Sequence, residues 1–167
     1  MCISIDVQSH TLQLQVACAH INYIAITAAT VALTGVLFAK AAHIPLPQKC
    51  KESDLIAVIE IAKSQVGGAS KPFQKIATAR LVETIKGRID GTSFQLDFDN
   101  GLACPNVTYE RSERCLVFLT KLPTGHFATY NSYFGAYTVH NDTVIGWERE
   151  TETKLEAVRK EIRKRVD

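Results

Sequence analysis

The amino-acid sequence has no charged side chain between Asp6 and Lys40. Within this stretch, residues 21–39 read INYIAITAATVALTGVLFA, which is apolar and about as long as the shortest helix that spans a bilayer. The tripeptide Ala39-Lys40-Ala41 follows directly and has the small-x-small pattern that signal peptidases accept. The stretch therefore predicts an N-terminal hydrophobic helix that is either cleaved after Ala41 or retained as a membrane anchor.

Both fates imply export. A signal peptide is expected to begin with Lys or Arg, whereas this chain carries Asp6 and a long segment before the apolar run. If the run from Ile21 to Ala39 is retained, it contacts the membrane and leaves the remaining domain outside the cytoplasm. A buried core helix is disfavoured, because the rest of the sequence offers little helix for packing. We therefore assign residues 1–41 to an extension with a signal peptide or anchor, and expect a periplasmic or extracellular protein.

The overall charge argues against one large class of partner. The 167 residues include 19 Lys and Arg against 17 Asp and Glu, which gives a formal net charge of +2, and 46% are hydrophobic. Nucleic-acid-binding domains typically concentrate basic charge on one face or segment. This composition predicts one compact, monomeric domain that does not bind nucleic acid.

The middle of the chain has the alternation of short β-strands. After a proline-containing linker at 42–49, turn residues such as Asn100-Gly101 separate short apolar or alternating runs. The first run is mostly apolar at both alternating positions and predicts a strand that is buried on both faces for part of its length. The third places Asp97 and Asp99 on a solvated face. The expected strands lie at 55–62, 73–85, 94–98, 115–119, 127–130, 133–139 and 143–147. Together they predict a mainly β domain at 50–148, a small antiparallel barrel or sandwich.

The C-terminal residues 149–167 predict an amphipathic α-helix. Thr153-Lys-Leu-Glu156 has the pattern of a capping box, in which the threonine and glutamate side chains satisfy the first backbone N–H groups. Apolar residues follow at helical spacing. They are Leu155, Val158, Ile162 and Val166. This narrow stripe is expected to pack against the β domain while the rest of the helix stays in solvent.

Three cysteines remain if the leader is cleaved, and an odd number leaves one thiol unpaired. Cys50 and Cys104 both lie in sequences typical of loops, whereas Cys115 opens the apolar strand CLVFL. An oxidising compartment therefore favours a Cys50–Cys104 disulfide. Cys115 as a nucleophile with His126 or His140 is the alternative, but no local motif supplies an orienting carboxylate, so an inert buried thiol is expected.

The sequence favours a non-enzymatic protein. The histidines and cysteines do not show the spacing of a metal site, and no phosphate-binding loop or nucleophile elbow occurs, so we expect no metal, no cofactor and no catalytic residues. A hydrolase that uses Cys115 or the Asp97/Asp99 face is kept as an alternative. Two carboxylates at i and i+2 beside a turn are more typical of a solvated strand face.

Aromatic residues gather in the last strands and provide the candidate ligand contacts. They are Tyr130, Tyr133, Phe134 and Tyr137, interleaved with small polar residues. Core packing is the simpler interpretation. The alternative is a platform on which a sugar or peptide stacks, because aromatic side chains combine apolar area with a polar group.

Several segments, taken in their order, resemble a known family. The first begins at Cys50 and reads CKESDLIAVIEI, the second is VETIKG at the end of the second strand, and the third is Cys104-Pro followed by YERSERCLVFL. Together with YFGAYTVHND they resemble the oligonucleotide/oligosaccharide-binding-type barrel, or OB-fold, of the tissue inhibitors of metalloproteinases. The resemblance is closest to similar exported bacterial domains of unknown function and covers about residues 50–147.

The resemblance implies an OB-like barrel and, at positions equivalent to Cys50 and Cys104, cysteines held in disulfides. Inhibition in the animal family depends on a Cys-x-Cys at the mature N-terminus, whose amine and carbonyl chelate the zinc of the protease. This chain lacks that motif, since cleavage after Ala41 would expose Ala42-His43-Ile44. We therefore expect an exported interaction module with a protein or glycan partner. The alternatives are an inhibitor-like protein without the chelating motif and an envelope hydrolase.

Overall fold

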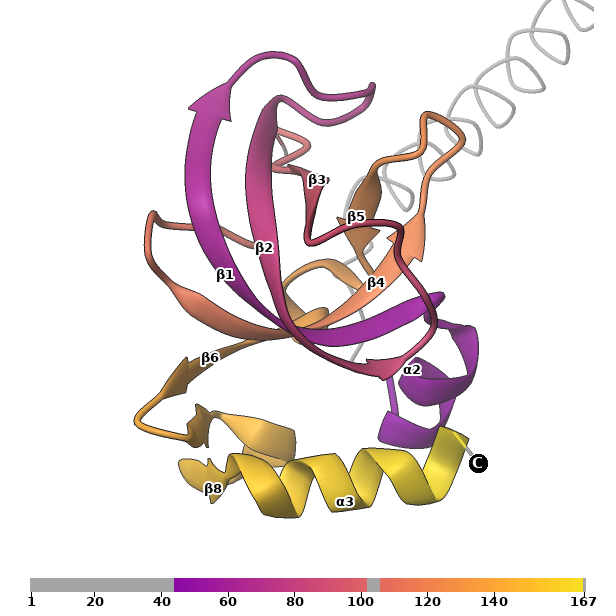
Figure 1. The fold of residues 1–167 in the computed structure, drawn as a ribbon, viewed down its shortest axis with the longest axis vertical. Coiled ribbons are helices and arrows are strands. Elements are labelled where there is room, and N and C mark those ends of the chain that lie inside the picture. The colour runs from indigo at the N-terminus through magenta and orange to yellow at the C-terminus, as the bar shows by residue number, and fades with distance from the viewer. Residues whose placement is uncertain (1–43, 102–105, 167) are drawn as a thin grey trace, which may run out of the picture. The chain divides into compact units, whose positions relative to one another are not determined.

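The computed structural model describes residues 44–101 and 106–166 (Figure 1). The predicted leader at 1–41 and Cys104 lie outside these residues. Eight strands and two α-helices are described, with two short 3-10 helices, η1 and η2. In chain order they are α2 (Leu46–Glu52), β1 (Leu55–Val66), β2 (Lys75–Lys86), β3 (Ser93–Phe98), β4 (Arg114–Lys121), β5 (Phe127–Thr129), η1 (Ser132–Gly135), β6 (Ala136–His140), β7 (Thr143–Ile145), η2 (Trp147–Arg149), β8 (Glu152–Lys154) and α3 (Leu155–Val166).

Five strands form a closed β-barrel. Their order is β1-β2-β3-β5-β4, and β4 also pairs with β1, which closes the sheet. The pairs are antiparallel except β3 and β5, which run parallel. The mainly β prediction is confirmed, and the architecture is a barrel. The single parallel pair was not predicted. It arises because β5 inserts between β3 and β4 instead of following β4 at the edge of the sheet.

Strand β1 separates two hydrophobic cores. Leu55, Ala57 and Ile59 point into the barrel interior, where they pack with buried residues of β2, β3 and β4. Ile56 and Val58 point to the opposite side and pack under the helices and the last strands. All five side chains are fully buried. The prediction that part of this strand is buried on both faces is confirmed for residues 55–59, where the helical segments cover the outside of the barrel, whereas residues 63–66 are exposed.

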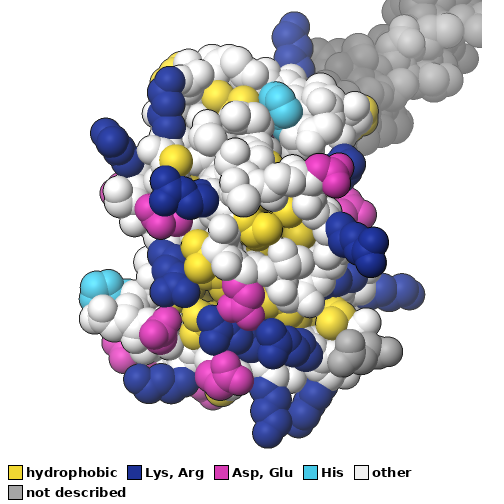
Figure 2. All heavy atoms as spheres, viewed as in Figure 1, with side chains coloured by type: hydrophobic (Ala, Val, Ile, Leu, Met, Phe, Trp, Pro, Cys, Tyr) yellow, Lys and Arg dark blue, Asp and Glu magenta, His cyan; other side chains and the backbone are white. Residues whose placement is uncertain are grey.

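Strands β6, β7 and β8 form a meander that leads into α3, which lies beside the barrel near α2 (Figure 1). Leu155, Val158 and Ile162 are buried, so the predicted apolar stripe of the helix is confirmed. Figure 2 shows basic side chains gathered over this end of the molecule with acidic ones among them. Ion pairs join the two kinds: Arg159 and Arg163 of α3 contact the Glu83 carboxylate of β2 at 2.7 and 3.2 Å.

The start of α3 differs from the prediction. The helix begins at Leu155, and Thr153 belongs to β8, where it pairs with Val144. The Thr153 hydroxyl donates to Glu150 Oε2 at 2.9 Å, so it does not form the predicted capping box. The Leu155 N–H donates instead to the Asp142 carbonyl at 2.9 Å. Strand pairing with β7 therefore holds this segment extended for one residue past the expected cap.

The predicted linker at 42–49 is wrong from residue 46 onward, because helix α2 begins there. Its prolines stand before and within the first turn, where a missing N–H costs no helical hydrogen bond. Lys49 and Cys50 are fully buried, so the loop setting expected for Cys50 is also wrong. The Lys86 ammonium donates to three carbonyl oxygens at the C-terminal end of α2. These belong to Cys50, Lys51 and Ser53, at 2.7, 3.0 and 2.6 Å.

The acidic face expected on β3 is also wrong. Asp97 is 1% exposed and takes part in hydrogen bonds that are described below, whereas Asp99 lies past the end of the strand in a left-handed backbone conformation. Across residues 44–101 and 106–166, no helix is long and apolar enough to cross a membrane.

Candidate functional site

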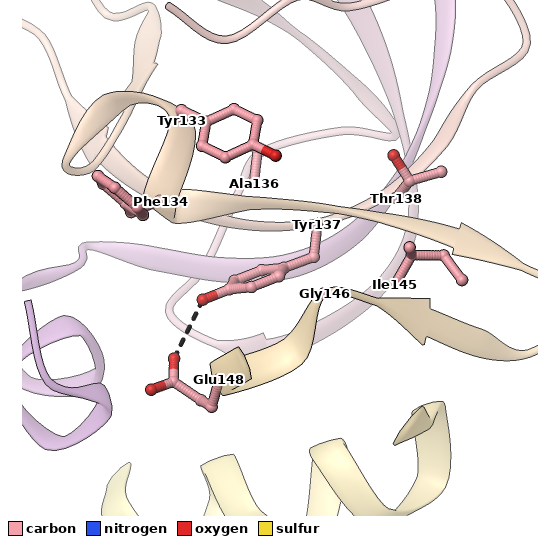
Figure 3. Close-up of a pocket in the computed structure, with 8 residues that line it drawn as sticks. All are labelled: Tyr133, Phe134, Ala136, Tyr137, Thr138, Ile145, Gly146 and Glu148. Atoms are coloured by element: carbon pink, nitrogen blue, oxygen red, sulfur yellow. Dashed lines mark hydrogen bonds between the residues drawn. The ribbon is translucent and has the colours of Figure 1, made fainter. Parts of the chain in front are cut away.

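A pocket of about 320 Å³ opens between η1 and β6 on one side and the segment from β7 to η2 on the other (Figure 3). Its lining combines aromatic rings, small residues and one carboxylate. The lining residues are Tyr133, Phe134, Ala136, Tyr137, Thr138, Ile145, Gly146 and Glu148. Tyr133 and Ile145 are 58% and 39% exposed, whereas Tyr137 is 9% exposed. The pocket therefore has an open apolar rim and a buried polar floor.

The turn that presents Tyr133 is held tightly against the preceding strand. Asn131, which precedes η1, and Ser132, its first residue, adopt left-handed backbone conformations. The helix ends at Gly135, where an added Cβ atom would lie 1.9 Å from the Tyr130 carbonyl oxygen. Since no side chain fits in that space, glycine permits the close approach. Tyr133 is consequently directed to the surface at a fixed position next to the pocket.

Three side chains from distant parts of the chain meet at the pocket floor. The Lys49 ammonium, from α2, lies 2.6 Å from Glu148 Oε1 and 2.5 Å from the Tyr137 hydroxyl oxygen. The Tyr137 hydroxyl donates to the same Glu148 oxygen at 3.1 Å, as the dashed line in Figure 3 marks. Lys49 also donates to the Phe134 carbonyl at 3.4 Å. The ammonium thus contacts three of the residues that line the pocket, from the side of the protein interior.

The lysine is placed where aromatic rings stabilise its charge. Its side chain has no exposed surface, and its ammonium lies 5.1 Å from the Tyr137 ring centroid and 5.6 Å from that of Phe118. Both distances are within the range of cation–π attraction. Burying an ammonium is unfavourable unless it is paired and hydrogen-bonded. Here the carboxylate, the hydroxyl and the rings together compensate for the loss of water.

The carboxylate at the floor is carried by a strained backbone. Glu148 has φ 43° and ψ 39°, a left-handed conformation that is unfavourable for a residue with a side chain. Strain of this kind persists where surrounding contacts enforce it and is often found at functional sites.

Burial and the adjacent Glu148 carboxylate raise the pKa of Tyr137. That hydroxyl therefore stays protonated and donates to Glu148 over the whole neutral range.

The structure brings three of the four predicted ligand-contact aromatics together. Tyr133, Phe134 and Tyr137 line the pocket, whereas Tyr130 lies outside the lining and its hydroxyl donates to Glu52 Oε2 of α2. That hydrogen bond, with burial and the Glu52 charge, raises the pKa of Tyr130 to about 12.

Lys49 and Glu148 were missed by sequence reasoning. The lysine fell in the expected linker, and the glutamate lies 99 residues away from it. One sequence pattern could have indicated that Lys49 lies on a buried helix face, because Leu46, Lys49 and Cys50 have i, i+3, i+4 spacing.

A second polar cluster is centred on Asp97. One carboxylate oxygen lies 2.9 Å from His126 Nδ1, and the other accepts hydrogen bonds from the Ser70 hydroxyl and, at 2.8 Å, the Ser70 N–H. The residue types are those of a hydrolytic triad, but the carboxylate stands between the serine and the histidine. A triad needs the histidine in the middle to accept the serine proton. The cluster therefore joins the β1–β2 loop and the β4–β5 turn to β3.

The Asp97/Asp99 pair is not brought together as a two-carboxylate site. Asp99 forms an ion pair with Lys75 at 2.7 Å and accepts the Gly101 N–H at 3.0 Å. These two contacts lower the pKa of Asp99. The side chain of His126 is 29% exposed and is bound to Asp97. The two acids consequently have separate structural partners.

Cys50 and Cys115, the cysteines within the described residues, each lie in one of the two hydrophobic cores. Cys115 belongs to the barrel interior, and burial together with the nearby Glu113 raises the pKa of its thiol. Cys50 belongs to the second core, and burial raises its thiol pKa as well. Both are free thiols in the structure. Because Cys104 lies outside the described residues, the Cys50–Cys104 disulfide stays a prediction.

In the part of the chain that the structure describes, no group of three or more His, Cys, Asp or Glu side chains is placed to hold a metal ion. No protein-family model matches the sequence, and comparison with curated proteins finds no relative.

Proposed function

We infer that the chain is an exported, non-enzymatic binding module built on an OB-like barrel, and that the Tyr133–Glu148 pocket is its ligand site. The closed five-stranded barrel, with β5 between β3 and β4, supports the OB-like assignment. The observation that carries the functional proposal is the buried Lys49–Tyr137–Glu148 group directly beneath an exposed tyrosine. The fold by itself implies no particular ligand.

The pocket floor is poorly explained as a device for stability alone. A buried ion pair is weak evidence for stabilisation, since well-packed apolar residues in its place often serve as well or better. Here the pair also requires Glu148 to occupy an unfavourable backbone conformation. The arrangement places a fixed carboxylate and a fixed hydroxyl against aromatic rings at the base of an open pocket, which is typical of ligand sites.

The placement of Asp97 and Cys115, the residues that a hydrolase would use, supports a non-enzymatic role. Asp97 is fully buried and bonded to Ser70 and His126, and Cys115 faces the closed barrel interior. Cys115 reaches only a small cavity of about 120 Å³ and is 2% exposed, so it lacks the substrate-sized opening that nucleophilic catalysis needs. Binding without chemistry is the simpler assignment for this fold.

Tryptophan fluorescence offers a direct test of the ligand site. Trp147 is the single tryptophan of the chain, and its ring lies 5.0 Å from that of Tyr137. The full chain would be titrated with neutral and charged oligosaccharides and with short peptides. We expect a saturable change with at least one class, reduced at least 10-fold in apparent affinity by Tyr133→Ala.

Tyr130→Phe is the matched control, because it changes an aromatic residue of the same segment outside the pocket lining. It should bind as the unmodified protein does. Equal binding by Tyr133→Ala and the unmodified protein would exclude this pocket as the ligand site.

Export has its own test, which is the N-terminus of the protein recovered from its host. A chain that begins at Ala42 supports cleavage, and an intact chain in the membrane fraction supports an anchor. An intact chain recovered in the cytoplasm would contradict both forms of the export proposal.

A further inference from the structure

We propose that the pocket takes an uncharged, hydroxyl-bearing ring, that is, a neutral saccharide, and that Lys49 is the residue that excludes cationic ligands. This inference rests on the proposed function, since it assumes that the pocket is the ligand site. It adds the ligand class and a specificity-determining residue that does not itself line the pocket.

Aromatic rings beside a carboxylate are the usual recognition elements for an organic cation. The pocket has both, in Tyr133, Phe134, Tyr137 and Glu148. The position of the cation, however, is already occupied from within the protein. The Lys49 ammonium lies 2.6 Å from the Glu148 carboxylate and 5.1 Å from the Tyr137 ring centroid. Lys49 thus takes the place that a ligand ammonium would otherwise fill.

The same lysine would repel a second cation. It touches atoms of Phe134, Tyr137 and Glu148, so a ligand ammonium that reached the pocket floor would lie close to it. Repulsion between like charges is strong where water is excluded, and the Lys49 side chain has no exposed surface. An anionic ligand would meet the Glu148 carboxylate, which is 24% exposed and nearer to solvent. Ligands of either charge are therefore disfavoured.

The rest of the lining suits a sugar ring. The Tyr133 ring is 58% exposed at the rim, and Ile145 is 39% exposed. Figure 3 shows Thr138 and Ile145 together at one end of the pocket, with the Tyr137 hydroxyl directed toward Glu148 at the other. An exposed aromatic face stacks against the apolar side of a pyranose, and side-chain oxygens accept hydrogen bonds from the hydroxyl groups of the sugar. No net charge is needed on the ligand for either contact.

A matched pair of probes tests the exclusion of cations. Choline carries a quaternary ammonium, and 3,3-dimethylbutan-1-ol is its neutral isostere. In the unmodified full chain we expect choline to bind at least 10-fold more weakly than the alcohol, measured by Trp147 fluorescence and calorimetry. In Lys49→Met, which removes the charge and keeps an unbranched side chain of similar length, we expect choline affinity to rise at least 10-fold. Preferential binding of choline by the unmodified protein would overturn the inference.

The ligand class is tested with three trisaccharides whose rings are similar and whose charges differ. They are the neutral trimer of N-acetylglucosamine, the cationic trimer of glucosamine and the anionic trimer of a uronic acid. The neutral trimer should bind at least 10-fold more tightly than either charged one. Absence of any neutral-saccharide binding in a wider panel would refute the class. Glu148→Gln is a second variant that tests the pair from its other side, and the comparison of choline with the alcohol in the unmodified protein needs no variant. Glu148→Gln leaves Lys49 without its carboxylate partner, so binding of the uronic acid trimer should rise at least 10-fold.

The two proposals fail in different ways. If saccharides bind but Tyr133→Ala has no effect, the pocket is not the site and the proposed function is wrong. If binding depends on Tyr133 while neither Lys49→Met nor Glu148→Gln changes the preference for charge, the site is correct and the role of Lys49 is wrong.

Discussion

The ammonium of Lys49 lies 2.6 Å from the carboxylate of Glu148, although 99 residues separate the two in the chain. This contact ties α2, at the start of the β domain, to η2, just before the final strand and helix. Lys49 is fully buried, whereas Glu148 is partly exposed. Substitutions at the two positions should therefore lower the free energy of unfolding by different amounts.

Glu148→Gln should lower the free energy of unfolding by about 3 kcal/mol, because it leaves a buried ammonium without a charged partner. Lys49→Met should cost less, about 1 kcal/mol, since the carboxylate that remains can contact water. The double variant should be close in stability to Lys49→Met alone. Urea denaturation of the four proteins completes a double-mutant cycle.

Lys51→Met is the control for this cycle, because Lys51 is an exposed residue of the same helix. Its stability should change by no more than about 0.5 kcal/mol. Additive effects of the two substitutions at 49 and 148 would show that the ion pair makes no net contribution.

Asp97 should be the most sensitive polar residue of the barrel. Asp97→Asn removes the charge that accepts hydrogen bonds from Ser70 and His126, and bonds to charged groups contribute about 1.5–3 kcal/mol each. We expect the variant to lose about 2–4 kcal/mol of unfolding free energy. Asp90→Asn, at an exposed turn position, should change stability by less than about 0.5 kcal/mol. Equal stability of the two variants would show that the cluster contributes little to joining the loops.

The barrel could be predicted from sequence because its strands carry local signals. Residues 55–59 of the first strand are all apolar because both faces of the strand are buried there, and CLVFL at 115–119 is buried throughout. Asn141-Asp142 forms the left-handed turn between β6 and β7 that its residue types favour. Local patterns predicted the wrong secondary structure where pairing with another segment of the chain determined it. Thr153, for example, joins β8 through pairing with β7 instead of capping a helix.

The candidate site was predictable in part for the same reason. Tyr133, Phe134 and Tyr137 stand close together in sequence, so their joint placement in one pocket required no long-range information. Lys49 reaches them because α2 packs beneath the last strands, and nothing in the sequence around residue 49 specifies that packing. The burial of Asp97 likewise depends on Ser70 and His126, which approach β3 from two separate loops.

The Tyr130–Glu52 hydrogen bond gives the fold a dependence on alkaline pH. The bond to Glu52, with burial and the carboxylate charge, raises the pKa of Tyr130 to about 12 from an ordinary value of 10.0. A group whose pKa is raised on folding stabilises the protein fully below its unfolded pKa. This contribution should therefore be intact below pH 10 and lost as the pH rises toward about 12.

The measurement is the titration of the Tyr130 ring by NMR of selectively labelled tyrosine. Glu52→Gln should move its midpoint back toward 10, because the charged acceptor is removed. The same variant should be indistinguishable in its alkaline stability from Tyr130→Phe. A Tyr130 midpoint near 10 in the unmodified protein would show that the hydrogen bond is absent in solution.

Thiol chemistry tests the last prediction, which concerns Cys50, Cys104 and Cys115. Cys50 and Cys115 are 0% and 2% exposed, and burial raises the pKa of both thiols, so neither should react with iodoacetamide at pH 8 in the folded protein. Rapid labelling of Cys115 would instead favour the hydrolase alternative. In exported protein that is denatured without a reductant, the predicted Cys50–Cys104 disulfide leaves Cys115 as the single reactive thiol of the three. Peptide mapping should then find the peptides of Cys50 and Cys104 joined, whereas three labelled thiols would exclude the disulfide and agree with the free Cys50 of the structure.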